Sequence, residues 1–179
     1  MSPCSREYIN RIEHERKVMK EQLIVGVMGG GHAETTDLDN AYILGSLIAE
    51  NKWILLNGGR NAGIMEASAK GAVENGGLTI GILPDDNNSK VSEYIKIPIL
   101  TGMGNARNCI NVLSSNVIVA CPGGAGTISE IALALKTGRT VICLNFDTGK
   151  IFNKYAESGL LFNVTEPHQA ITIIKGANC

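Results

Sequence analysis

Short apolar runs alternate along the chain with longer segments that are typical of helices. Each apolar run has the length of a strand and is followed by a turn of small or polar residues. The expected strands span residues 23–28, 53–56, 78–83, 97–100, 117–120, 140–144 and, near the end of the chain, 161–164. The expected helices span residues 6–20, 36–50, about 63–75, about 105–114, 131–136 and a last segment that begins near Pro167. Thr36 to Asp39 resembles a capping box, which would open the second of these helices.

Strand and helix alternation of this kind predicts a parallel sheet with helices on both faces. A chain of 179 residues is long enough to bury one substantial core. We therefore expect an α/β fold, a single doubly wound Rossmann-like domain with a mostly parallel sheet of six or seven strands. The domain is expected to cover residues 21–179, and residues 1–20 form a separate charged N-terminal helix in this interpretation.

Glycines cluster directly after four of the expected strands, at 29–31, 58–63, 102–104 and 123–126. In a parallel sheet all of these turns lie along the carboxyl edge, where open α/β sheets bind ligands at a topological switch point. The connections at the opposite edge are short. The asymmetry predicts one pocket covered by glycine loops.

The segment from Cys121 to Glu130 carries the strongest chemical signal. It follows an apolar strand and leads into an alanine- and leucine-rich helix, so it forms a strand, glycine turn and helix unit. The free N–H groups of a first helical turn are suited to an anion, most often a phosphate. A tight turn without a ligand is the alternative. No P-loop sequence is present, and the partial dinucleotide pattern at 124–129, with Asp147 after the next strand, is a weak match.

Pro122 to Glu130 resembles the Pro-Gly-Gly-x-Gly-Thr-x-x-Glu signature of the "lysine decarboxylase-like" family. Residues 58–65 and 77–84 are similar to the family's other long block, and Arg107 precedes Pro122 at the spacing of the family's active-site arginine. The characterised enzymes of this family are phosphoribohydrolases that cut the N-glycosidic bond of nucleoside monophosphates, including cytokinin-activating ones. The resemblance implies a Rossmann-like fold and a homodimer or homotetramer, and it does not imply lysine decarboxylation.

Three positions depart from the hydrolase pattern. Asn108 stands where a lysine usually follows the arginine, Glu66 replaces a small residue, and Ser129 replaces the first of two glutamates. With these changes the chain resembles a neighbouring subgroup that is similar to molybdenum-cofactor carrier proteins. The resemblance therefore supports the fold and an anion site more directly than it supports hydrolysis.

The candidate catalytic residues, if the chain is a hydrolase, are Arg107 and Glu130. Glu130 would stabilise the positive charge that develops on the ribose, and the planar guanidinium of Arg107 would hold phosphate or ribose oxygens. Alternatively, Thr127 to Glu130 is itself a capping box, in which Thr127 caps the helix and Glu130 has a structural role only. The candidate ligand-binding residues are Gly29, Gly30, Gly58, Gly59, Arg60, Gly102, Asn105, Arg107, Gly123, Gly124, Ala125, Gly126 and Thr127.

Charge and cysteine content exclude several classes of partner. The 16 basic and 17 acidic residues give a net charge of −1, which does not favour nucleic acid or an anionic membrane. The five cysteines and three histidines are scattered, so we expect reduced thiols, no metal site and a cytoplasmic location. No apolar run is long enough to span a membrane.

Three hypotheses follow for the function. The first is a binding or carrier protein for a phosphorylated small molecule, either a nucleotide or a pterin such as molybdenum cofactor, and this is the hypothesis we favour. The second is a nucleoside 5′-monophosphate phosphoribohydrolase that releases the free base and ribose 5-phosphate. The third is a nucleotide-responsive interaction module. None of them requires a further cofactor for chemistry.

Overall fold

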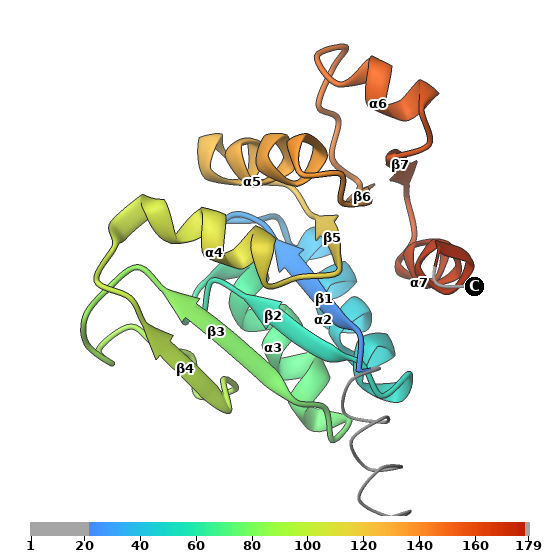
Figure 1. Cartoon of the computed structure of the whole chain (residues 1–179). Coiled ribbons are helices and arrows are strands. Elements are labelled where there is room, and N and C mark those ends of the chain that lie inside the picture. The colour runs from blue at the N-terminus through green and yellow to red at the C-terminus, as the bar shows by residue number, and fades with distance from the viewer. Residues whose placement is uncertain (1–21, 178–179) are drawn as a thin grey trace, which may run out of the picture.

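A seven-stranded, all-parallel sheet forms the centre of the molecule, and helices cover both of its faces (Figure 1). The computed structural model describes residues 22–177, so the expected helix at 6–20 lies outside the described residues. The strands are β1 (Ile24–Met28), β2 (Ile54–Asn57), β3 (Thr79–Leu83), β4 (Ile97–Leu100), β5 (Val117–Ala120), β6 (Val141–Leu144) and β7 (Leu161–Val164). The helices are α2 (Thr35–Glu50), α3 (Gly63–Glu74), α4 (Arg107–Leu113), α5 (Ala125–Lys136), α6 (Asn153–Glu157) and α7 (Pro167–Ala177). The predicted Rossmann-like α/β fold is confirmed.

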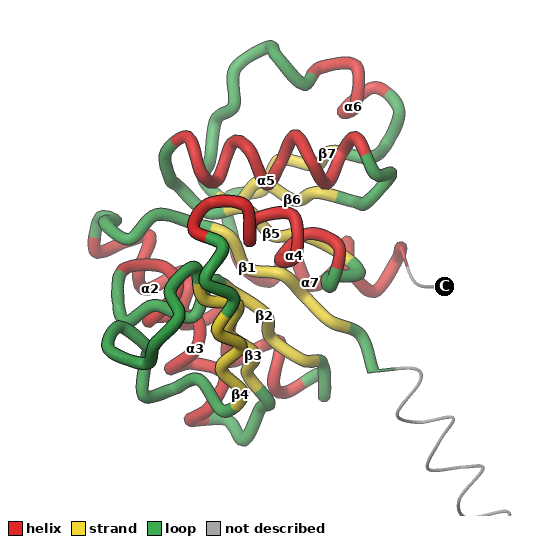
Figure 2. The backbone as a smooth tube through the Cα atoms, turned by 60° about the vertical axis from the view of Figure 1, so that its left-hand side comes forward, coloured by secondary structure: helices red, strands yellow, loops and turns green. Residues whose placement is uncertain are grey.

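The two faces of the sheet belong to two separate apolar cores. Alternate residues of one strand point to opposite faces, so Val117 and Val119 of β5 join one core while Ile118 and Ala120 join the other. The first core receives side chains from α2, α3 and α7, and the second from α4 and α5 (Figure 2). Burial on both faces explains why the central strands are continuous apolar runs rather than alternating ones.

The strand order is β4-β3-β2-β1-β5-β6-β7. The chain therefore builds the sheet outward from β1 in one direction through β4, and then returns to place β5 on the other side of β1. The loops that follow β1 and β5 leave neighbouring strands in the middle of the sheet, which is the topological switch point of the fold.

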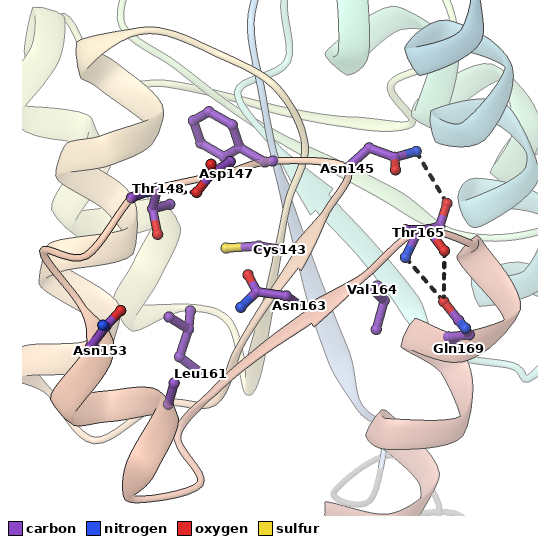
Figure 3. A pocket seen from close by; sticks show the side chains of 13 residues that line it. Cys143, Asn145, Asp147, Thr148, Asn153, Leu161, Asn163, Val164, Thr165 and Gln169 are labelled. Atoms are coloured by element: carbon purple, nitrogen blue, oxygen red, sulfur yellow. Dashed lines mark hydrogen bonds between the residues drawn. The ribbon is translucent and has the colours of Figure 1, made fainter.

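The connection from β6 to β7 differs from the others because it contains only α6, a helix of five residues. The 12-residue α5 connects β5 to β6. Side chains of β7 and of the segment before α6, including Asn163 and Thr148, consequently face an open hollow (Figure 3).

Two expected helix starts are wrong. Helix α2 begins at Thr35 and Glu34 is its N-cap, so Thr36 lies inside the first turn and no side chain caps it. The carbonyl of Glu34 accepts hydrogen bonds from the N–H groups of Asp37 and Leu38. Helix α5 begins at Ala125 with Gly124 as its N-cap, whereas Thr127 was expected to cap it. In both cases the backbone path, rather than a capping side chain, sets the first turn.

Among the described residues, no helix combines the length and the apolar character needed to cross a membrane. The same residues contain no group of three or more His, Cys, Asp or Glu side chains placed to hold a metal ion.

Helices α2 and α3 pack backbone against backbone through two glycines. A Cβ on Gly45 of α2 would press on the carbonyl oxygen of Ser68 in α3 and lie 3.0 Å from the backbone nitrogen of Ala72. A Cβ on Gly71 of α3 would similarly press on the carbonyl oxygen of Tyr42. The close approach of the two helices therefore depends on glycine at both positions.

This contact predicts whether an alanine at position 45 raises or lowers the free energy of unfolding. Gly→Ala inside a helix is ordinarily stabilising by about 1 kcal/mol, yet we expect Gly45→Ala to be destabilising by about 1–3 kcal/mol because the helices must separate. The control is Gly176→Ala in α7, where a Cβ meets nothing within 4 Å. Urea unfolding of both variants measures the difference. Equal stabilisation by the two substitutions would show that the helices do not pack this closely.

Candidate functional site

The backbone N–H and C=O of Gly30 hold three loops together at the carboxyl edge of the sheet. Its N–H donates to the carbonyl of Pro122 at 2.9 Å, and its carbonyl accepts from the N–H of Ile64 at 3.0 Å. The loop after β1 is thus bonded on one side to the loop after β5 and on the other to the start of α3. A Cβ on Gly29 would lie 2.6 Å from Cγ2 of Ile64, so the close approach requires glycine there.

A cavity of about 480 Å³ opens between these loops and the start of α4. Its volume lies within the range of small-molecule sites. The lining residues come from four segments that lie within or next to the four glycine loops predicted for the carboxyl edge of the sheet: Gly29, Gly30, Gly31, His32, Arg60, Ala62, Met65, Asn105, Arg107, Asn108, Gly124, Gly126, Thr127 and Glu130. A second hollow, of about 560 Å³, shares Gly30, Gly31, His32 and Gly124 with it and extends over Glu34 and Asp37.

The N-terminus of α5 faces this cavity without a side-chain cap. Gly124 is the N-cap residue, and the first amide of the segment to donate within the helix is that of Ile128, to the carbonyl of Gly124. The N–H groups of Ala125, Gly126 and Thr127 have no acceptor among the described residues. The helix start therefore offers three donors and a partial positive charge to an anion.

The glycines of this loop serve two different purposes. A Cβ on Gly123 would collide with Oγ1 of Thr127 and approach the nitrogen of Gly30 to 2.9 Å, so packing requires glycine at 123. A Cβ on Gly124 would meet no atom within 4 Å, and one on Gly126 would meet only the Asn108 amide at 3.9 Å. The fold does not explain these two glycines, whereas a ligand held against the backbone does.

The interpretation of Thr127 to Glu130 as a capping box is wrong. Because α5 begins at Ala125, Thr127 is its third residue, and Glu130 lies a further turn along the helix. The Glu130 side chain instead points to α4, where its Oε1 accepts a hydrogen bond from Nδ2 of Asn111 at 2.7 Å. The same oxygen lies 3.9 Å from a terminal nitrogen of Arg107.

Arg107 lies deep in the cavity wall with only 14% of its side chain exposed. Its guanidinium packs flat against Gly58, where a Cβ would stand 2.6 Å from one of its terminal nitrogens. The Nε atom is buried and has no hydrogen-bond partner in the described part of the chain. A side chain at position 58 would therefore clash with the guanidinium of Arg107 in this position. The Nε–H of Arg107 remains available as a hydrogen-bond donor.

Burial disfavours the ionised form of both side chains of the Arg107–Glu130 pair. Desolvation raises the pKa of Glu130, while the Asn111 hydrogen bond and Arg107 lower it. Desolvation likewise lowers the pKa of Arg107 below its ordinary value, against the attraction of Glu130. A guanidinium stays protonated in proteins, so Arg107 keeps its charge and burial acts mainly on the ionisation of Glu130. The carboxylate is therefore less readily ionised than an exposed glutamate.

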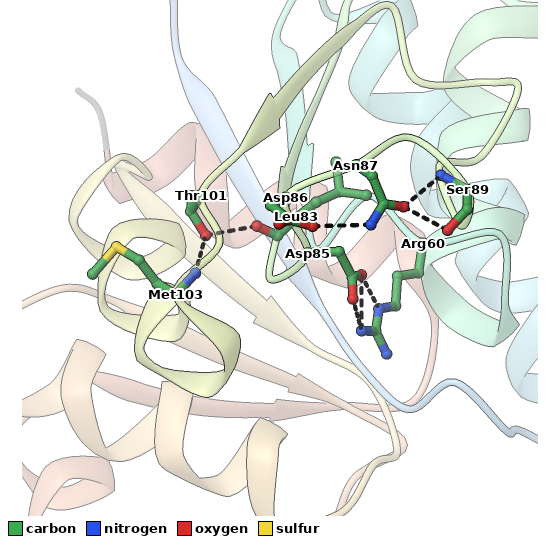
Figure 4. A network of polar contacts seen from close by, with 8 residues as sticks. All are labelled: Arg60, Leu83, Asp85, Asp86, Asn87, Ser89, Thr101 and Met103. Atoms are coloured by element: carbon green, nitrogen blue, oxygen red, sulfur yellow. Dashed lines mark hydrogen bonds and ion pairs between the residues drawn. The ribbon is translucent and has the colours of Figure 1, made fainter.

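Arg60 lines the same cavity but is already paired. Its Nε and one terminal nitrogen donate to the carboxylate of Asp85 at 2.9–3.2 Å (Figure 4). Asp85 follows β3, and its backbone carbonyl also accepts from the N–H of Gly102, which joins the loops after β3 and β4. Arg60 thus offers a ligand its remaining donors rather than a free charge.

Two of the positions that depart from the hydrolase pattern lie against each other. Nδ2 of Asn108 donates to Oγ of Ser129 at 2.9 Å, and Ser129 Oγ donates to the carbonyl of Gly126 at 2.6 Å. A neutral hydrogen-bonded pair therefore lies beside the first turn of α5, and its Asn108 member lines the cavity.

The structure brings together most of the predicted ligand-binding residues. Gly29, Gly30, Arg60, Asn105, Arg107, Gly124, Gly126 and Thr127 line the main cavity, and Gly123 lines the second hollow. Four predicted residues line neither: Gly58, Gly59, Gly102 and Ala125. Gly58 supports Arg107, and Gly59 packs against Gly81 and Leu83 at the edge of the sheet. Ala125 contributes only its backbone N–H at the start of α5.

Sequence reasoning missed Asn111, which orients Glu130, and Asp85, which pairs with Arg60. Asn111 could have been found, because it lies four residues after Arg107 and so on the same face of α4. Asp85 could not, because its pairing depends on how the loop after β3 folds back. Glu66, a noted departure, does not line the cavity, although its Oε2 is buried without a partner in the described residues.

The chain is similar over most of its length to solved structures of known proteins, and it also has a relative known from its sequence. The molybdenum cofactor binding protein of Rippkaea orientalis is 48% identical, with a TM-score of 0.84 over 89% of this chain and 99% of that one. The molybdenum cofactor carrier protein of Chlamydomonas reinhardtii is 41% identical, with a TM-score of 0.79 over 87% of this chain and 98% of that one. An uncharacterised protein of Archaeoglobus fulgidus is 48% identical over 67% of this chain and 78% of its own length.

The family resemblance seen in the glycine motifs is confirmed at the level of the whole domain. The sequence model of the SLOG cluster4 family matches residues 22–171, which include every strand of the sheet and all four glycine loops. The chain belongs to the SLOG cluster4 family.

Proposed function

We propose that the protein is a carrier that binds a phosphorylated cofactor of the molybdenum-cofactor type, with the phosphate at the N-terminus of α5. The observation that carries the proposal is the uncapped first turn of α5, where Gly124 and Gly126 leave open space that the fold does not require. The two relatives named as molybdenum cofactor proteins, at 41–48% identity, support the choice of cofactor.

The residues present fit such a ligand. A phosphate would accept from the N–H groups of Ala125, Gly126 and Thr127 and would be compensated by Arg107, whose Nε has no partner among the described residues. The cavity and the adjoining hollow, about 480 and 560 Å³, share Gly30, Gly31, His32 and Gly124 in their linings, and each volume lies in the range of small-molecule sites. A tightly bound anion also suits an arginine that is poorly solvated on its own.

A nucleoside-monophosphate phosphoribohydrolase is the second candidate, and the position of Glu130 favours it. The carboxylate lines the cavity beside Arg107, as a residue that stabilises an oxocarbenium-like charge must. Burial, however, raises the pKa of Glu130, so the ionised carboxylate that would stabilise a cation is less favourable here than on an exposed glutamate. The neutral Asn108–Ser129 pair also lacks the charges of the hydrolase pattern. We therefore place carrier function first.

The first prediction concerns the loop. Gly124→Val should abolish binding of AMP, used as a phosphate-bearing probe, because its branched side chain would project into the space proposed for the phosphate. Its stability should be nearly unchanged, since a Cβ there meets no protein atom within 4 Å. Calorimetric titration with AMP and native mass spectrometry of the purified protein measure binding. The control is Ala132→Val on the exposed side of α5, and unchanged affinity in both variants would identify the loop as a simple turn.

The second prediction separates carrier from enzyme. In a carrier, Arg107→Ala should weaken AMP binding by about 1.5–3 kcal/mol, the contribution of a charge-assisted hydrogen bond. Glu130→Gln keeps an oxygen for Asn111 and removes a negative charge, so affinity should stay the same or improve. Wild-type protein incubated overnight with AMP should release no adenine on chromatography. Adenine release that Glu130→Gln abolishes would overturn the carrier proposal in favour of the hydrolase.

We also propose that the protein is a homodimer or homotetramer, as the family resemblance implies, and that β4 is covered by another copy. All four residues of this edge strand are exposed, and Ile97 and Ile99 keep 44% and 43% of their surface accessible. An exposed apolar edge strand is an aggregation hazard unless something covers it.

The third prediction tests this surface. Sedimentation velocity should show wild-type protein as a dimer or tetramer and Ile99→Lys as a monomer, because a charge at the edge would be buried in the contact. Ile151→Lys is the matched control, since Ile151 is 70% exposed and lies far along the chain in the segment before α6. Monomeric wild-type protein at micromolar concentration would contradict the proposal.

A further inference from the structure

A hollow of about 560 Å³ lies between β7, α6 and the segment that follows β6 (Figure 3). It shares no lining residue with the glycine cavity or with the hollow beside that cavity. Nothing in the proposed carrier function uses it.

The hollow results from the short crossover between β6 and β7. Cys143 and Asn163 are register partners in these strands, so their side chains lie on the same face of the sheet. Cys143 is buried, whereas Asn163 is exposed because the five-residue α6 does not extend over it. A polar side chain therefore stands on a face that is apolar elsewhere in the sheet.

Some polar side chains around the hollow are already used to hold its walls. Nδ2 of Asn145 donates to the carbonyl of Thr165, and Oε1 of Gln169 accepts from the N–H groups of Thr165 and Glu166. These bonds fix the end of β6 against the start of α7. The frame of the hollow is thus held by hydrogen bonds before any ligand enters.

Other polar side chains of the lining have no partner within residues 22–177. Thr148, Asn153 and Asn163 line the hollow and make no side-chain hydrogen bond there. In Figure 3 they surround the open space above Leu161. Two amides and a hydroxyl supply both donors and acceptors to a molecule placed between them.

The charge of the lining selects against anions. Asp147 is its one carboxylate, with Oδ1 accepting from the N–H of Gly149 at 2.7 Å, and no Lys, Arg or His belongs to the lining. Burial raises the pKa of the Cys143 thiol to about 11, so this floor residue is neutral at physiological pH. The lining therefore has no cationic side chain to compensate an anion, whereas its carboxylate and amide oxygens can accept hydrogen bonds from a neutral ligand.

We propose that this hollow is a second small-molecule site, which takes an uncharged ligand rich in N–H and O–H donors, such as a nucleoside or a monosaccharide. Asn163 and Asn153 pair with the ligand through their amides, Asp147 accepts from its donors, and Leu161 contacts its apolar face. The volume lies in the range of small-ligand sites. The site is independent of the anion site at α5.

The competing explanation is that Asn163 only protects the β7 edge from pairing with another chain, as polar residues at sheet edges do. That explanation requires no ligand and gives Asn153 and Thr148 no role. Titration of the full-length protein with a neutral ligand distinguishes the two.

The experiment titrates adenosine and, separately, glucose into the protein and follows backbone amide shifts by NMR. We expect saturable shifts at residues 145–149 and 161–165 with at least one of them, and the ligand that binds identifies the class. Asn163→Ser and Asn153→Ala should each weaken binding about tenfold through lost hydrogen bonds. Asn88→Leu, an exposed amide in the β3–β4 segment, is the matched control and should bind as wild type does.

The glycine-loop variant Gly124→Val separates this proposal from the carrier function. It should retain the neutral ligand while losing AMP. Absence of saturable shifts with both ligands would overturn the second site, as would binding that neither asparagine variant weakens. Binding that Gly124→Val abolishes would also overturn it, because the ligand would then occupy the α5 site.

Discussion

The site depends on the two hydrogen bonds made by the backbone N–H and C=O of Gly30, which join the loops after β1 and β5 to the first turn of α3. Both bonds run between backbone groups, so no side-chain substitution removes them directly. They require instead that the chain approach closely at Gly29 and Gly63, where a Cβ would strike Ile64 or the Gly30 carbonyl. Because β1 and β5 are neighbours at the topological switch point, Gly30 also holds the loop that leads into α5 beside the start of α3.

A second constraint is electrostatic. Arg107 and Glu130 lie 3.9 Å apart in a wall where desolvation opposes both charges, and the Nε of Arg107 and the Oδ1 of Asn111 are buried without partners in the described residues. Such an incompletely paired network destabilises the empty site. A phosphate would relieve the arginine, while ionised Glu130 would repel it. In the proposed carrier, these opposed effects would keep affinity moderate, which suits a ligand that must be released.

The sheet could be predicted from the sequence because each buried strand is a short apolar run bounded by glycine or polar turns, and all seven expected strands are present. The glycine clusters also predicted where the cavity lies. Local sequence patterns did not predict the first residue of two helices, because the backbone path determines where each helix begins. Thr36 and Thr127 both match the pattern of a helix N-cap, yet Glu34 and Gly124 are the N-cap residues. Pairings across loops, such as Arg60 with Asp85, depend on the folded chain and leave no local signal.

The contact between Asn108 and Ser129 explains why two departures from the hydrolase pattern occur together. Their side chains share a hydrogen bond of 2.9 Å, so a change at one position alters what the other contacts. A lysine at 108 facing Ser129, or a glutamate at 129 facing Asn108, would place a charge beside the first turn of α5 without a counterpart at the other position. The retained Arg107 and Glu130 lie 3.9 Å apart beside α5. In the proposed carrier, burial raises the pKa of Glu130 and so reduces the repulsion that its carboxylate exerts on a bound anion, while Arg107 keeps its charge.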